Sequence, residues 1–108
     1  MPIKNEKERK AWDIKYHAAR REHDKQQRLH RYTRLRKWYR AYKAGVGCML
    51  CPETHPACVS FHHRDPNTKK FEVSVGVTRI YSVKNLLTEI AKCDAICHNC
   101  HAKLHYNP

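Results

Sequence analysis

The sequence predicts an α+β protein in which a long basic helical arm, residues 1–45, precedes a small metal-binding module, residues 46–108. Residues 1–45 hold 15 Lys/Arg and 5 Asp/Glu, a net charge of +10, whereas residues 46–108 hold 7 and 5, a net charge of +2. All six cysteines lie in the second part. The first part has no glycine or proline between Ile3 and Ala44, which favours one continuous helix.

Apolar side chains in the arm recur at steps of three and four, which predicts one apolar stripe along the helix. The stripe consists of Leu29, Tyr32, Leu35, Trp38, Tyr39 and Tyr42. We expect it to pack against the metal-binding module, and we expect Gly45 to end the helix. The first half of the arm is mostly charged apart from Trp12 and Tyr16. It is expected to be either a solvated helix or a segment that orders on binding.

The excess of positive charge predicts a polyanionic partner. The whole chain has 22 Lys/Arg and 10 Asp/Glu, a formal net charge of +12. Basic residues outnumber acidic ones three to one in the arm, whereas a solvated helix usually intersperses both signs. This composition suits contact with the phosphates of a DNA duplex. The candidate contacts are Arg28, Arg31, Arg34, Arg36, Lys37, Arg40 and Lys43.

Hydropathy argues against a membrane protein. Mean hydropathy is −0.87, and no apolar run approaches the roughly 20 residues that a span needs. The N-terminus is charged and lacks the pattern of a signal peptide, so a cytoplasmic location is expected. A role at a membrane surface is disfavoured because the apolar face of the arm is narrow and aromatic. No small-molecule organic cofactor is expected, and no feature specifies an oligomeric state.

The metal-binding module is predicted to begin with a strand and a turn. Val59–Phe61 is a strand candidate that leads directly into His62 and His63. The turn that follows is Arg64-Asp65-Pro66-Asn67. Valine and phenylalanine then alternate with polar or small residues, which predicts extended structure. The alternating residues are Phe71, Val73, Val75 and Val77.

Three short elements are predicted for the rest of the module. Ser82 can cap a helix whose apolar side chains, as far as Ala91, fall at helical spacing. Asp94–Ile96 is a strand candidate, and Ala102–His105 fits a short terminal helix.

Two Cys-x2-Cys pairs, separated by 45 residues, predict one closed zinc site. Their members are Cys48, Cys51, Cys97 and Cys100. Each pair can form a knuckle with two thiolates, and two knuckles complete a tetrahedral site. The alternatives are disulfides or a redox motif, but a redox pair would need a βαβ context and would not need two copies. Cys58 and Cys93 are expected to be packed free thiols, and the alternative is that either one substitutes into the zinc site.

Four histidines form a second candidate site. His62 and His63 end the first strand, while His101 and His105 are four residues apart and share one face of a helix. Three imidazoles from these elements could bind a divalent ion and leave positions open. A further histidine beside such an ion could deprotonate water for phosphodiester hydrolysis.

The arrangement resembles the HNH endonucleases, in the zinc-stabilised branch common in phages and bacteria, through Phe61-His62-His63 and Cys97-x2-Cys100-His101-x3-His105. The resemblance covers about residues 46–107. It implies a ββα-metal fold, in which a two-stranded hairpin and a helix surround one catalytic divalent ion. It further implies that His62, His101 and His105 hold this ion, which is Mg²⁺, Mn²⁺, Ni²⁺ or Zn²⁺. By the same resemblance, His63 is the general base and the four knuckle cysteines hold structural Zn²⁺.

The chain departs from the family at one position. The family's middle Asn orients the general base, and its place, nine residues before His101, is taken by Lys92. A lysine cannot accept a hydrogen bond from an imidazole. A backbone carbonyl near Lys92 or Asp94 would then orient His63. Two functions follow as expectations: an endonuclease that cuts or nicks DNA, in the host cytoplasm if phage-encoded, or a non-catalytic zinc-stabilised DNA-binding protein.

Overall fold

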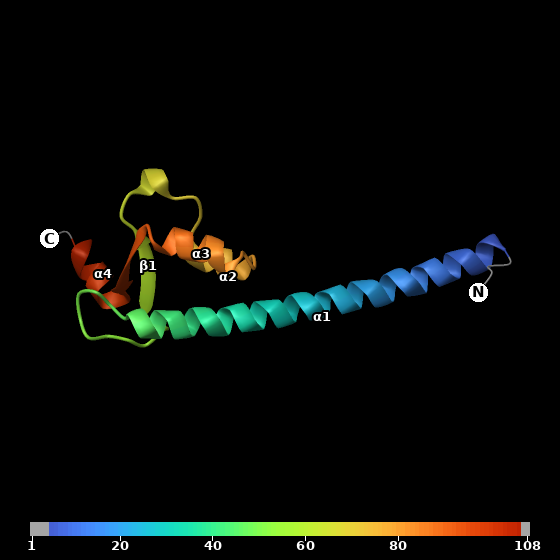
Figure 1. The fold of residues 1–108 in the computed structure, drawn as a ribbon, viewed down its shortest axis with the longest axis horizontal. Helices are drawn as coiled ribbons and strands as arrows, with labels where there is room; N and C mark the ends of the chain where they lie inside the picture. Colours follow the sequence, from blue (N-terminus) through green and yellow to red (C-terminus); the bar gives the residue numbers. More distant parts are fainter. Residues whose placement is uncertain (1–4, 107–108) are drawn as a thin grey trace. The chain divides into compact units, whose positions relative to one another are not determined.

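A computed structural model describes residues 5–106 and confirms the α+β class and the long N-terminal helix (Figure 1). The elements are α1 (Glu6–Val46), β1 (Val59–His63), the 3-10 helix η1 (Pro66–Thr68), α2 (Val73–Thr78), α3 (Val83–Ile90), β2 (Cys93–Cys97) and α4 (His98–Leu104). Residues 1–4, which belong to the predicted arm, and residues 107–108 lie outside the described range. No helix within the described range is both long and apolar enough to cross a membrane.

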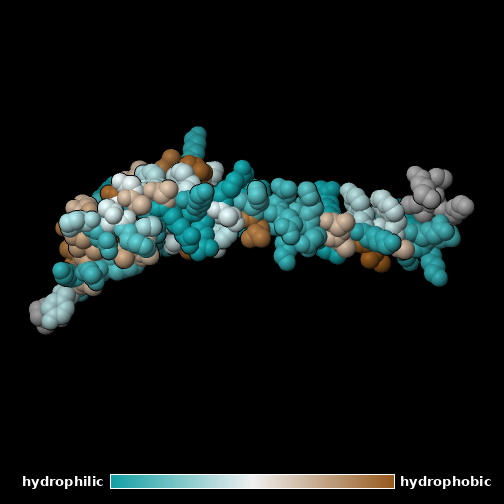
Figure 2. All heavy atoms as spheres, turned by 90° about the horizontal axis from the view of Figure 1, so that it is seen from below, coloured by the Kyte–Doolittle hydropathy of each residue, from teal (hydrophilic) through white to brown (hydrophobic). Residues whose placement is uncertain are grey.

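The chain divides into two compact units, residues 1–31 and 32–108. In the first unit, α1 begins after Asn5, whose Oδ1 accepts a hydrogen bond from the N–H of Glu8 at 2.8 Å. The rings of Trp12 and Tyr16 stack one turn apart, with centroids 5.1 Å apart. Figure 2 shows mostly hydrophilic side chains on the face of this helical segment that is turned to the viewer. The structure describes this segment as a helix whose side chains are mostly exposed.

In the second unit, the core is built around a two-stranded antiparallel sheet. β1 pairs with β2 in a register that runs from Val59 opposite Cys97 to His63 opposite Cys93. The strand candidates of the sequence are therefore confirmed, and each is longer than predicted. Val59, together with Leu86 of α3, is completely buried.

The later part of the apolar stripe packs into this core, as predicted. Leu35 and Tyr39 of α1 are buried. The ring centroids of Tyr39 and Tyr42 lie 6.1 and 6.0 Å from that of Phe61 in β1. Leu29, at the start of the stripe, is 56% exposed. The last turns of α1 therefore belong to the unit that holds the sheet, which places the division earlier than residue 45.

The prediction of extended structure between Phe71 and Val77 is wrong. Residues Val73–Thr78 form α2, and its buried residues Val73, Gly76 and Val77 have helical spacing. A Cβ on Gly76 would lie 2.7 Å from Phe71 Cε2 and 2.8 Å from Leu86 Cδ2. Burial of the two valines against α3 thus overrides the β-propensity of the alternating pattern.

Residues next to the helix ends explain where α1 stops and where α3 starts. α1 continues past Gly45, where it was predicted to stop, and ends before Gly47, which has φ +67°. Glycine adopts this left-handed conformation without steric cost, and the N–H of Gly47 donates to Lys43 O at 2.9 Å. α3 begins as predicted, because Ser82 Oγ accepts from the N–H of Asn85 at 3.1 Å. α4 begins at His98, earlier than predicted.

Gly76→Ala should lower the free energy of unfolding by about 1–3 kcal/mol, because the added methyl group collides with Phe71 and Leu86. Gly45→Ala is the matched control, since no heavy atom lies within 4 Å of the added Cβ. This variant should be neutral or stabilising by up to about 1 kcal/mol. Urea titrations of both variants measure the difference, and equal effects would contradict the close contact at Gly76.

Candidate metal and catalytic site

The four knuckle cysteines come together in one cluster. Their sulfur atoms all lie within 4.8 Å of one another. Among residues 5–106, no other group of three or more His, Cys, Asp or Glu side chains has its ligand atoms this close together. The cluster could therefore hold a structural metal ion such as zinc, as the spacing predicts.

The first knuckle is held by backbone contacts. The positive φ of Gly47 turns the chain out of α1. The N–H of Cys48 then donates to Glu53 O at 2.8 Å, and the N–H of Met49 donates to Ala95 O at 2.9 Å. The second of these bonds ties the knuckle to β2. A backbone hydrogen bond therefore links the first knuckle to the strand that leads into the second, in addition to the clustering of the four sulfur atoms.

The second knuckle lies where β2 ends and α4 begins. Cys97 is the N-cap residue of α4, and its Sγ accepts from the N–H of Cys100 at 3.4 Å. The N–H groups of Cys97 and Leu50 donate to Cys48 Sγ at 3.3 and 3.4 Å. Desolvation raises the pKa of Cys48, but these bonds outweigh it and lower the pKa to about 6.

A bound cation is needed to ionise all four thiols together. Hydrogen bonds to the sulfurs of Cys97 and Cys51 raise the pKa of Cys100 to about 12. The thiols therefore share protons when no cation offsets their charge, and a metal ion that binds thiolates would release them.

The two remaining cysteines lie outside the cluster and are free, as predicted. Cys93 is buried, its Sγ contacts Glu89 O at 3.4 Å, and burial raises its pKa to about 11. Cys58 is half-buried, and its hydrogen bond with the Glu53 side chain raises its pKa.

The two histidines of β1 lie on opposite faces of the sheet, because side chains alternate along a strand. His62 stacks on His101 of α4, with ring centroids 4.0 Å apart and an interplanar angle of 10°. The ring of His101 lies 4.5 Å from that of His105. The structure therefore brings together the three histidines predicted to bind a catalytic ion. Their ligand nitrogens are not as tightly grouped as the cysteine sulfurs.

His62 has the features of a metal ligand. Its Nε2 is the one buried side-chain N or O atom in the described part of the chain that lacks a hydrogen-bond partner. Burial lowers the pKa of His62, and the nearby His101 lowers it further. A neutral imidazole with a buried, unpartnered nitrogen fits the ligand form that divalent ions require.

His63 faces α3, where it contacts a buried acid that the sequence analysis missed. Its Nε2 lies 3.3 Å from Glu89 Oε1, and the two side chains are 5% and 1% exposed. Glu89 follows Leu86 at helical spacing on the buried face of α3. The sequence does show one acid within the apolar stripe of α3. It does not show the partner of this acid, because His63 belongs to a different element.

The Glu89 carboxylate accepts further hydrogen bonds. The N–H of Lys70 donates to Oε1 at 3.0 Å, and Lys92 Nζ lies 3.2 and 3.3 Å from the two oxygens. Burial acts to raise the pKa of Glu89, but the hydrogen bonds from Lys70, Lys92 and His63 outweigh it and lower the pKa. Glu89 is thus an ionised carboxylate at neutral pH.

The expectation that a backbone carbonyl orients His63 needs correction. The carbonyl of Lys92 accepts from the N–H of Arg64 at 3.1 Å, and the partner of His63 is the Glu89 side chain. The Asp94 carboxylate also pairs with Arg64, at 3.0 Å. α3 ends two residues before Lys92, and Lys92 Nζ contacts the Glu89 carboxylate.

The seven basic residues predicted to contact DNA all lie on α1. Six are exposed: Arg28, Arg31, Arg34, Arg36, Lys37 and Arg40. Lys43 is half-buried, with its Nζ 4.7 Å from the centroid of the Tyr39 ring. Partial burial and the nearby Arg40 lower the pKa of Lys43.

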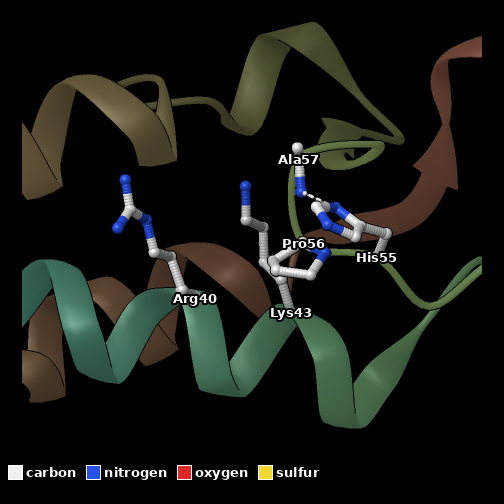
Figure 3. A pocket seen from close by; sticks show the side chains of 5 residues that line it. All are labelled: Arg40, Lys43, His55, Pro56 and Ala57. Carbon is white, nitrogen blue, oxygen red and sulfur yellow. Dashed lines mark hydrogen bonds between the residues drawn. The ribbon is translucent and has the colours of Figure 1, made fainter.

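Two of these residues line a cavity within the second unit. Arg40 and Lys43 extend from the same side of α1 toward the loop that holds His55, Pro56 and Ala57, and these five residues line about 480 Å³ (Figure 3). His55 Nδ1 accepts from the N–H of Ala57 at 3.1 Å, which holds the ring in the lining. The lining has cationic side chains and no acidic one, so an anionic group fits it.

Comparisons with family models, with curated proteins and with solved structures found no match to this chain. The resemblance to HNH endonucleases therefore stays a prediction from two motifs. The chemistry assigned to the site rests on the contacts of its own residues.

The purified protein should hold about one zinc ion per chain, and Cys48→Ser should remove both the ion and the cooperative unfolding transition. The reason is that metal binding supplies folding energy to so small a core. Cys58→Ser is the control, because this thiol lies outside the cluster. Metal analysis and thermal circular dichroism measure both properties. Cooperative unfolding after full chelation, or a disulfide within the cluster, would contradict this prediction.

Proposed function

We propose that this chain is a metal-dependent HNH endonuclease that hydrolyses DNA phosphodiester bonds. The observation that carries the proposal is the buried, unpartnered Nε2 of His62 beside the stacked ring of His101. The pairing of β1 with β2, followed directly by α4, is compatible with the ββα-metal architecture that the family resemblance implies.

His62, His101 and His105 would hold one divalent ion, which could be Mg²⁺, Mn²⁺, Ni²⁺ or Zn²⁺. When bound, such an ion stabilises negative charge on the phosphate and on the leaving oxygen. The low pKa of His62 supports this role, because only the neutral imidazole offers a lone pair.

His63 would act as the general base. Its imidazole takes a proton from a water molecule while the water oxygen forms a bond to phosphorus. The ester bond to the leaving oxygen breaks, and that oxygen takes a proton from solvent. The contact of His63 with Glu89 supports the assignment, because a base must be held in one orientation to remove a proton efficiently.

The basic residues of α1 would bind the DNA backbone. The exposed arginines from Arg28 to Arg40 provide charge without a device for reading bases, so they would give affinity more than sequence selectivity. The cavity beside Arg40 and Lys43 is large enough to take one phosphate group.

A non-catalytic, zinc-stabilised DNA-binding protein is the second candidate. The observation that favours it is the low exposure of the His63 side chain, 5%, which restricts access of water to the imidazole. In that case the contact between His63 and Glu89 would only attach β1 to α3. Cleavage activity distinguishes the two functions.

Purified protein should nick or cut supercoiled plasmid in the presence of a divalent ion. His63→Ala should lower the rate by on the order of 10²–10⁴-fold with the fold, zinc and DNA affinity unchanged, because only the general base is lost. His101→Ala should also abolish cleavage, because this variant should bind less of the divalent ion proposed for the histidine site.

If the wild-type protein binds DNA but never cleaves it with Mg²⁺, Mn²⁺, Ni²⁺ or Zn²⁺, the non-catalytic function is favoured. If His63→Ala cleaves as fast as wild type, the general base is a different residue.

Arg40→Gln should weaken DNA binding and lower the log–log salt slope by roughly 0.9, the value for one lost phosphate contact on a duplex. Lys84→Gln is the matched control, because it removes one exposed positive charge from α3 and leaves α1 intact. Fluorescence anisotropy at several salt concentrations gives both slopes. Equal slopes for the two variants would show that only the net charge of the protein matters.

A further inference from the structure

The hydrogen bond between His63 and Glu89 has a defined direction. An ionised carboxylate has no proton to donate, and the low pKa of Glu89 keeps it ionised at neutral pH. The hydrogen in the 3.3 Å contact therefore lies on His63 Nε2. In the neutral imidazole, this leaves the lone pair on Nδ1.

The carboxylate is itself fixed by two other donors. The backbone N–H of Lys70 donates to Oε1 at 3.0 Å, and Lys92 Nζ contacts both oxygens. Lys92 Nζ also donates to Thr68 O at 3.0 Å, which limits its own movement. Glu89 is 1% exposed, so it has no room to rotate away from His63. The direction of the imidazole is thus set by Glu89 and Lys92 together with the segment that holds Thr68 and Lys70.

We propose that Glu89 is the positioning residue of the site, which holds His63 with its hydrogen on Nε2 and directs its Nδ1 lone pair toward the attacking water. This inference rests on the proposed function, since it assigns a role within that reaction. Lys92 in turn holds the Glu89 carboxylate in place, with its Nζ 3.2 and 3.3 Å from the two oxygens.

The role of Glu89 is electrostatic as well as geometric. When Nδ1 takes the proton from water, His63 becomes an imidazolium with a hydrogen on each nitrogen. Glu89 stabilises this cation through the existing Nε2–H bond and takes no proton itself. In hydrolase triads, too, a histidine acts as the base while a buried carboxylate orients it and stabilises its protonated form.

A purely structural contact would behave differently. It would attach β1 to α3 whichever nitrogen carried the hydrogen, and its loss would lower stability without acting through His63. The tautomer of His63 and the coupling of two substitutions therefore separate a positioning role from a structural one.

The first measurement uses the intact zinc-loaded protein and needs no cleavage. Nitrogen-15 NMR of the histidine side chains at mildly alkaline pH reports the tautomer, with the His63 signal assigned by its loss in His63→Ala. We expect the hydrogen on Nε2 and the lone pair on Nδ1. A hydrogen on Nδ1 would overturn the proposal, even if Glu89 variants fail to fold.

The second measurement is a double-mutant cycle in the plasmid assay. Glu89→Gln keeps the shape of the side chain and removes its charge, and we expect kcat to fall about 10²-fold or more with KM and zinc content unchanged. In the His63→Ala background, Glu89→Gln should have no further effect. Asp94→Asn is the control that removes a carboxylate paired with Arg64 instead, and it should leave kcat unchanged.

Outcomes of the cycle decide between the alternatives. Additive effects of Glu89→Gln and His63→Ala, or equal effects of Glu89→Gln and Asp94→Asn, would overturn the positioning role. A wild-type protein that never cleaves DNA would refute the proposed function and with it the role of Glu89 in that reaction. The tautomer measurement would still decide separately which atom donates in the contact between His63 and Glu89.

Discussion

The pairing of β1 with β2 determines where the two candidate histidines of β1 lie. Its register sets His63 opposite Cys93 and His62 opposite Asp94. Because consecutive residues of a strand lie on opposite faces, one histidine meets α4 and the other meets α3. A two-stranded sheet is marginal by itself, so it depends on what covers and clamps it. The aromatic residues of α1 cover it near Phe61, and the cysteine cluster holds the end at Cys97.

The features that the sequence predicts correctly are those that depend on residues close to one another in the chain. Cys-x2-Cys spacing is a property of a few adjacent residues, and the knuckles it predicts do meet in one cluster. The Ser82 cap and the His62-His63 strand end are equally local. By contrast, α2 depends on burial of Val73 and Val77 against α3, and no local pattern records that contact. Glu89 was missed for the same reason, because two of its three partners, His63 and Lys70, come from β1 and from the segment before α2.

Burial of a carboxylate has a cost that this site offsets with hydrogen bonds. An isolated buried charge is strongly unfavourable, so the 1% exposure of Glu89 requires compensation. Three donors provide it, one of them the ammonium group of Lys92. Such an arrangement adds little to stability compared with a well-packed apolar side chain. The presence of this carboxylate in so small a core fits a requirement for a polar group next to His63.

The lysine at position 92 and the buried acid at position 89 form one coupled feature. Taken alone, Lys92 departs from the motif, because a lysine cannot orient an imidazole. In the structure its Nζ lies against the carboxylate that contacts His63. An asparagine at position 92 would leave Glu89 without this cation, and the cost of keeping the carboxylate ionised would rise. In this structure the partner of the His63 imidazole is therefore the side chain at position 89, one turn before Lys92.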